Sequence, residues 1–237
     1  MDPKNTSDSH QEARDTMAAT VEQLRVLAAA EPETYLHQLA DCLGQLGVAA
    51  SRLEQHEAAA AAFREAAELT RKLATERPEM RPLLAMHLHN LGISQGLCQM
   101  PAEEFASLSE SVVFLRQLAS SQPEEYLPRF AFRARDLAEV AQALGQQAAA
   151  RFFTLEALDA FNALAEKNPE LFLVELAWSF KALGIVMLEA GRREDALAAY
   201  HMAFERLHAV AQIDPERVPT AELQGTRIMV ECLQNPE

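Results

Sequence analysis

The chain has 237 residues, enough for one or two domains, and its 21 basic and 35 acidic residues give a formal net charge of −14. Apolar residues make up 49% and charged residues 24%, the composition of a soluble globular protein with a substantial hydrophobic core. These values exclude a disordered chain and a disulfide scaffold, and the negative charge opposes binding to nucleic acid.

The N-terminal segment is polar. Residues 1–11 contain no apolar signal segment, and we expect them to form a disordered tail. Residues 12–31 carry apolar residues at helical spacing and are expected to form an N-terminal capping helix. The three cysteines, Cys42, Cys98 and Cys232, are odd in number and far apart, which favours a reducing compartment. We therefore expect a cytoplasmic protein.

Two sequence markers recur with one period along the rest of the chain. A Pro-Glu dipeptide recurs every 45 or 46 residues, at Pro32, Pro78, Pro123, Pro169 and Pro215. A leucine followed by a small residue recurs with the same period, at Leu46, Leu91, Leu137 and Leu183. The markers predict four repeats and a C-terminal capping helix with its tail, over residues 32–77, 78–122, 123–168, 169–214 and 215–237.

Each repeat is predicted to form two helices. Pro-Glu suits the start of the first helix, because proline fits the first helical turn and glutamate favours its positive end. Asn168 and Asp214 precede two of these prolines as helix caps. Pro82 and Pro219 predict a later start in the second and fifth units. No window has the alternation of a strand. The first helices are expected to end near Leu53, Cys98, Leu144 and Ala190.

A small residue follows each marker leucine, where the two helices of a hairpin are expected to approach closely. These small residues are Gly47, Gly92, Ala138 and Gly184. Sixteen residues further on, the second helix carries Phe63, Leu108, Thr154 and Tyr200. We expect these small and large side chains to form a repeating lock.

The pattern resembles the tetratricopeptide repeat. The clearest copy runs from Leu183-Gly184 through Ala196 and Tyr200 to Ala203. The ordinary repeat has about 34 residues, and this one is about eleven residues longer, with both helices extended. The second and third repeats depart from the pattern at Glu104, Ser111, Ala138 and Thr154. The resemblance implies an all-α fold, a right-handed α-α superhelix of helical hairpins whose inner face binds peptides or helices.

No motif of enzymatic chemistry stands out. His87 and His89 are two residues apart, so they point to nearly opposite sides of a helix and cannot share a metal ion. Glu205 and His208 have the spacing of a di-iron helix, but no second such pair exists. The cysteines fall within or at the ends of first helices, and we interpret them as buried structural thiols. We expect no catalytic residue, no metal and no cofactor.

The inner face of the first helices supplies the predicted binding site. Counting from the small residue of each marker places large apolar residues on this face: Met86, Ile93, Leu97, Phe132, Trp178, Ile185 and Leu188. Exposed apolar patches mark interaction sites, and Trp and Arg are favoured binding residues. A histidine and basic residues on the same face are expected to take an acidic group or a terminal carboxylate: His89, Arg129, Arg135 and Lys181. Asn90, just before the marker Leu91, is included in the predicted site because it resembles one position of a family subtype that clamps terminal carboxylates; the clamp is incomplete here, so its ligand is not expected. The same count in the first repeat gives Asp41, Gly44, Val48, Ser51 and Arg52.

Two alternatives stay open for this face. A tight superhelix, or a helix at 215–233 that folds inward, would bury the apolar residues as core. Asp136 and Glu139 would neutralise the neighbouring arginines.

We therefore predict a non-enzymatic protein–protein interaction adaptor. It binds a peptide or helix with apolar anchors and acidic groups in the concave groove of repeats 2–4. The alternative is a regulatory or oligomeric assembly subunit that controls a separate effector protein, pairing through Ile228, Met229, Val230 and Leu233. The basic cluster of Arg129, Arg133 and Arg135 is interpreted as a solvated helix face, not a nucleic-acid site. The charge-free segment 82–102 is too polar to cross a membrane.

Overall fold

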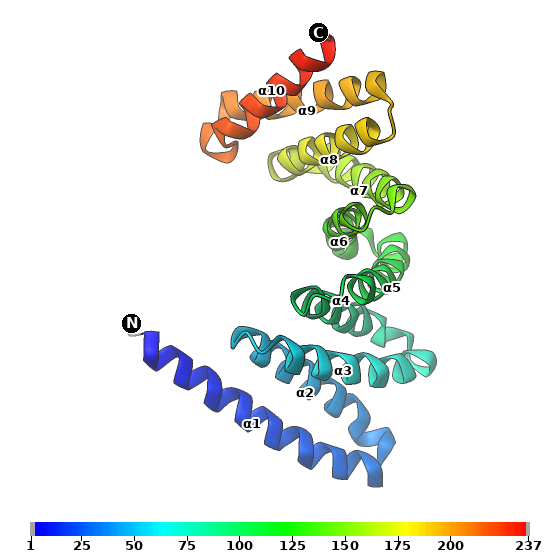
Figure 1. Ribbon diagram of the computed structural model, residues 1–237. Coiled ribbons are helices and arrows are strands. Elements are labelled where there is room, and N and C mark those ends of the chain that lie inside the picture. The colour runs from blue at the N-terminus through cyan, green and yellow to red at the C-terminus, as the bar shows by residue number, and fades with distance from the viewer. Residues whose placement is uncertain (1–2, 236–237) are drawn as a thin grey trace. The chain divides into compact units, whose positions relative to one another are not determined.

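The structure is a computed structural model that describes residues 3–235, with side chains described from Gln11 onward. All regular secondary structure within residues 3–235 is helical, which confirms the all-α class (Figure 1). The chain divides into two compact units, Met1–Gln117 and Leu118–Glu237, which we call unit 1 and unit 2.

Unit 1 is built from helical hairpins in which each helix packs on the next. Helix α1 packs on α2, α2 on α3, and α3 on α4. The elements are α1 (Pro3–Ala30), α2 (Pro32–Arg52), α3 (His56–Glu76), the short 3-10 helix η1 (Pro78–Met80), α4 (Arg81–Leu97) and α5 (Pro101–Ser121), whose last turn crosses into unit 2.

Unit 2 repeats the same arrangement. Helix α6 packs on α7, α7 on α8, α8 on α9, and α9 on α10. The elements are α6 (Pro123–Ala143), α7 (Gln147–Lys167), α8 (Pro169–Glu189), α9 (Arg193–Ile213), the 3-10 helix η2 (Pro215–Arg217) and α10 (Thr220–Gln234).

Most predicted boundaries of the first helices agree with the structure. Helices α2, α6 and α8 begin at the proline of their Pro-Glu pair, while α4 and α10 begin later, after a 3-10 turn, as Pro82 and Pro219 predicted. Asp214 caps η2 by accepting a 3.2 Å hydrogen bond from the amide of Glu216. The cap predicted at Asn168 is wrong, because its side chain makes no capping hydrogen bond.

The N-terminal helix is longer than expected. Helix α1 begins at Pro3, so residues 3–11 are helical where a disordered tail was expected, and the rest of that tail, residues 1–2, lies outside the described residues. Proline fits the first turn of a helix, and a helix that has formed extends easily where neither glycine nor proline interrupts it. No glycine or proline follows until Pro32.

Four hairpins turn through a residue in the left-handed backbone region. These residues are Glu54 (φ 57°), Gln99 (φ 60°), Gly145 (φ 69°) and Gly191 (φ 71°). In each turn the following amide donates to the carbonyl five residues earlier, at 2.8–3.0 Å, as in a Schellman motif. The four bonds join Gln55 to Ala50, Met100 to Gln95, Gln146 to Ala141, and Arg192 to Met187. Two hairpins therefore place a residue with a Cβ where glycine is favoured.

Removing a glycine from one of these turns and adding a glycine to another should change the free energy of unfolding in opposite directions. Gly145→Ala is expected to lower the free energy of unfolding by about 1 kcal/mol, because the left-handed region is unfavourable for alanine. A Cβ at Gly145 would meet no atom within 4 Å, so the effect belongs to the backbone alone. Glu54→Gly should raise the free energy of unfolding by about 0.5 kcal/mol, less because glycine also increases unfolded-state entropy. Urea unfolding measures both, and changes of the same sign would contradict this account.

The predicted lock between small and large residues is confirmed in three hairpins. A Cβ added at each glycine would lie 2.7 Å from the nearest side-chain atom, in the pairs Gly47–Phe63, Gly92–Leu108 and Gly184–Tyr200. Only a residue without a Cβ lets the helices come this close. In the remaining hairpin Ala138 and Thr154 stand at these positions, and both line a residual cavity of ≈ 10 Å³.

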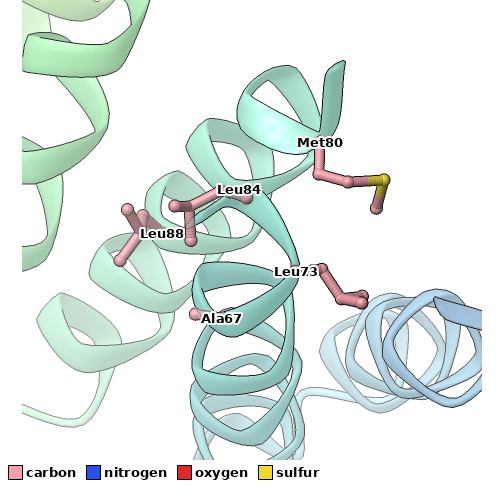
Figure 2. Close-up of a cluster of buried hydrophobic side chains, with 6 residues drawn as sticks. Ala67, Leu73, Met80, Leu84 and Leu88 are labelled. Atoms are coloured by element: carbon pink, nitrogen blue, oxygen red, sulfur yellow. The ribbon is translucent and has the colours of Figure 1, made fainter. Parts of the chain in front are cut away.

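Leucines bind the hairpins of unit 1 to one another. One buried cluster joins α3, η1 and α4 (Figure 2). It contains Ala67, Leu73 and Ala74 of α3, Met80 of η1, and Leu84 and Leu88 of α4. Met80 is buried because the 3-10 turn directs it back toward the cluster. The delayed start of α4 thus contributes a core side chain.

Candidate protein-binding surface

The apolar residues predicted for the second repeat lie exposed on one face of α4. Met86 is 47% exposed, Ile93 41% and Leu97 53%. Their spacing of seven and four residues places them on one side of the helix. We call these three residues the α4 stripe.

The polar residues predicted beside the α4 stripe are less accessible. Asn90 is half-buried. His89 is buried, at 8% exposure, so its predicted place on the open inner face is wrong. His89 lies a few tens of degrees around the helix from the α4 stripe. Counting residues from the marker leucine does not resolve so small a rotation.

A cleft with a volume of ≈ 280 Å³ opens beside the stripe. Its walls come from α1, α2 and α4, and it is lined by Ala13, Met17, Asp41, Gly44, Gln45, Val48, Ala49, Arg52 and Met86. The marker count had placed Asp41, Gly44, Val48 and Arg52 on the inner face of the first repeat, but they were not included in the predicted site. The contribution of α1 was missed, because the sequence indicated only an amphipathic capping helix there.

The cleft carries one charge at each end of its α2 wall. Asp41 accepts a 2.8 Å hydrogen bond from the side-chain amide of Gln45 one turn later. Arg52 is exposed and makes no ion pair with any described residue. Val48 lies between them and is 37% exposed. The surface is therefore apolar at its centre, with a free guanidinium at the C-terminal end of α2.

The residues predicted on α6 are largely engaged within unit 2. Arg135 forms an ion pair with Glu175 of α8, and its guanidinium lies 5.1 Å from the centre of the Phe132 ring. Phe132 itself packs edge-on against Phe161, with centroids 5.1 Å apart. Arg129 is exposed, and its guanidinium lies 5.4 Å from the Tyr126 ring.

Asp136 neutralises part of the positive charge of the basic cluster. This is one of the two alternatives that the sequence left open. Asp136 lies 3.1 Å from a guanidinium nitrogen of Arg133 and 4.0 Å from one of Arg135. Glu175, the stronger partner of Arg135, was not anticipated, because it lies 40 residues away in sequence.

The residues predicted on α8 meet the C-terminal helix. Lys181 forms an ion pair with Glu222 of α10. Trp178 and Leu223 of α10 pack on the same buried cluster, formed around Val174 and Leu207. Ile185 and Leu188 pack on a second cluster that contains Val230 and Leu233 of α10. The open alternative of an inward C-terminal helix therefore holds for this part of the predicted groove.

The same packing removes most of the apolar end cap considered for oligomerisation. Val230 and Leu233 are buried, and Met229 is half-buried. Ile228 remains 55% exposed, beside the ion pair of Arg227 with Glu231. The exposed face of α10 is mainly polar.

The interpretation of the cysteines as buried structural thiols is wrong for Cys232, which is exposed, while Cys42 and Cys98 are half-buried. All three cysteines are unpaired. Burial, with a smaller effect of Asp41, raises the pKa of the Cys42 thiol above its ordinary value, which keeps it protonated at neutral pH. No three His, Cys, Asp or Glu side chains come together as metal ligands in the described part of the chain.

Among the residues that the structure describes, one helix has the length and composition of a membrane span. Helix α8 passes this test, whereas the segment considered from sequence, 82–102, does not. In the structure α8 packs between α7 and α9 as a repeat helix, and core helices of soluble proteins pass the same test.

Comparison with known proteins agrees with this architecture. No protein-family model matches the chain, and no curated protein matches it. Among solved structures, BtubC (BKLC) from P. vanneervenii is similar with a TM-score of 0.60 at 17% identity, covering 94% of this chain and 82% of that one. A kinesin light chain protein of Podosopora anserina with TPR-like repeats has a TM-score of 0.52 at 15% identity, covering 85% of this chain and 97% of that one.

These similarities define the class of fold. The chain is a TPR-like array of helical hairpins, which confirms the resemblance drawn from the Leu-Gly, aromatic and alanine positions. At these identities the comparisons establish the fold and not the length of the repeat unit or the partner.

Proposed function

We propose that the chain is a non-enzymatic adaptor that binds a peptide or helix of another protein through the α4 stripe. The observation that carries the proposal is the exposure of Met86, Ile93 and Leu97, each more than two-fifths accessible on one face of α4. Three large apolar side chains aligned in this way are costly to leave in water, and such patches typically mark interaction sites.

Of the large apolar residues predicted for the groove, those of the stripe are the ones that their own unit leaves exposed. The corresponding residues of α8, Trp178, Ile185 and Leu188, are packed on core clusters shared with α10. We therefore assign the apolar anchors of the partner to unit 1.

The net charge of the chain indicates the class of partner that it binds. A net charge of −14 disfavours nucleic acid and anionic membrane surfaces, and it leaves a protein segment as the ligand. Three unpaired cysteines support a cytoplasmic location.

Affinity capture from native cell extract tests the proposal. The bait proteins are the wild type, an Ile93→Glu/Leu97→Glu variant, and Val26→Glu as a matched control. Val26 is 71% exposed on α1, so a charge there alters an exposed apolar residue outside the stripe. We expect a partner retained by the wild type and the control to be reduced at least about tenfold by the stripe variant, a change of about 1.4 kcal/mol.

Helical circular dichroism must first show that all three proteins are folded. A partner retained equally by the stripe variant would contradict the proposal. Loss of that partner in a Phe132→Ala/Trp178→Ala variant would instead place the binding surface on α6 and α8.

A further inference from the structure

The cleft between α1 and α2 has a filled counterpart one hairpin further along unit 1. Ala13 and Met17 of α1 stand 46 residues before Ala59 and Phe63 of α3. Ala59 and Phe63 are 0% and 2% exposed, and they share a buried cluster with Ala50 of α2. In the cleft, by contrast, Ala13 is exposed and Met17 half-buried. Both sites have an alanine followed four residues later by a large apolar side chain. Only the site at Ala59 and Phe63 is covered by a neighbouring helix.

The contact of α2 with Ala59 and Phe63 of α3 indicates what kind of helix would fit the cleft. Helix α2 approaches α3 closely because Gly47 faces the Phe63 ring, 2.7 Å from the position of an added Cβ. A helix on α1 would need a glycine or alanine at the same register, facing Met17. No described helix covers Met17 from that side.

The charge on the cleft wall adds a second requirement. Arg52 occupies the register that Glu189 occupies on α8. Glu189 accepts a 2.9 Å hydrogen bond from Gln142, a residue in the last turn of the preceding first helix, α6. A helix in the cleft would thus direct a side chain of its last turn at Arg52, and an acidic residue there would form an ion pair.

We propose that the α1–α2 cleft receives an amphipathic α-helix of a partner protein, packed on α1 as α2 packs on α3. The partner helix carries a small residue facing Met17 and an acidic residue facing Arg52. The partner helix would cover Ala13 and Met17 as α2 covers Ala59 and Phe63, and this goes beyond the binding proposed at the α4 stripe.

A second copy of this chain is a poorer occupant. Helix α10 has the register of a first helix, but the position of Gly47 falls on Val230. Val230 is larger than glycine and 6% exposed in the core of its own unit. It cannot face Met17 without leaving that core.

A synthetic helix tests the proposal directly. The probe is a fluorescein-labelled peptide with the sequence of residues 32–52 and the change Ser51→Glu, titrated into the full chain under reducing conditions. We expect saturable binding by fluorescence anisotropy. A peptide that also carries Gly47→Leu should bind at least about tenfold more weakly, because the bulky residue keeps the helix away from Met17.

Variants of the chain locate the probe. Ala13→Glu, at an exposed helical position that tolerates glutamate, should weaken binding about tenfold, whereas Ile93→Glu on the α4 stripe should leave it unchanged. Arg52→Glu should weaken binding about threefold, and a probe with Ser51→Lys in place of Ser51→Glu should restore it.

Three outcomes would overturn the proposal. The first is absence of saturable binding, or equal binding of the Gly47→Leu peptide. The second is loss of binding with Ile93→Glu but not with Ala13→Glu, which would place the helix on the stripe and leave the proposed function standing. The third is a peptide-free mass that doubles with concentration and reverts with Ala13→Glu, which would make a second copy the occupant.

Discussion

Acidification from pH 7.5 to 4.5 should destabilise the wild-type protein by about 2–3 kcal/mol more than a His87→Gln variant. His87 is fully buried in α4, and burial lowers the pKa of its imidazole from 6.5 to about 4, although Asp41 acts in the opposite direction. Between these two pH values the unfolded chain binds a proton that the folded chain excludes, so stability falls as pH falls. Each unit of pKa difference corresponds to about 1.4 kcal/mol.

Burial excludes that proton from the folded protein, and the surroundings of the ring offer it no acceptor. The Thr70 hydroxyl donates to the carbonyl of Ala66 at 2.7 Å, so its single proton is used. The 3.0 Å contact between Thr70 and Nδ1 of His87 therefore has the imidazole as donor. Nε2 faces Gly44 and has no partner among the described residues, and a proton there would have no acceptor.

Urea unfolding as a function of pH measures the effect. The control is His37→Gln, the same substitution at an exposed histidine of α2. Subtracting the variant from the wild type removes the contribution of the many carboxylates. Parallel pH curves for the wild type and His87→Gln would show that His87 is not the responsible group.

Gly184→Ala should destabilise unit 2 by about 2 kcal/mol. The new Cβ would lie 2.7 Å from Cε2 of Tyr200, whose ring is only 3% exposed and cannot move aside. Overpacking costs about 1–3 kcal/mol, and the buried Tyr200 ring places this site at the upper end of that range. The helix propensity that alanine gains over glycine offsets about 1 kcal/mol, which leaves a net loss of about 2 kcal/mol. Thermal and urea unfolding measure the loss.

Gly225→Ala is a matched control in the same unit. Gly225 lies inside α10, and an added Cβ there would meet nothing within 4 Å. Only helix propensity changes, so this variant should gain about 1 kcal/mol. The double variant Gly184→Ala/Tyr200→Leu should be more stable than the sum of its single changes by at least about 1 kcal/mol, since the shorter side chain makes room. Strict additivity would remove the steric explanation.

Local signals predicted the fold well. Pro32, Pro123 and Pro169 begin helices because proline has a fixed preference for the first helical turn, and this preference does not depend on tertiary contacts. Gly47 and Gly184 were placed in close contacts because the spacing to Phe63 and Tyr200 recurs at one register. The capping role of Asn168 failed because a side-chain cap competes with other local geometries.

The candidate site was predicted only in part. Met86, Ile93 and Leu97 are exposed, since helical periodicity alone decides which side of α4 they share. Helical periodicity does not show that Lys181 meets Glu222, or that Trp178 shares a core with Leu223. Those contacts depend on how a later helix packs, which is a property of the tertiary structure. The α1–α2 cleft was missed for the same reason.

Among the described residues of each unit, every pair of helices in extensive contact is adjacent in sequence. Stability in such an array is a sum of nearest-neighbour terms, and no single nucleus need form before the rest. Unfolding then proceeds by fraying from a helix with one neighbour toward helices with two. Helices α1 and α10 should accordingly exchange their amide hydrogens faster than α3 and α8. A ligand that packs on α1 would give it a second neighbour and slow exchange there first.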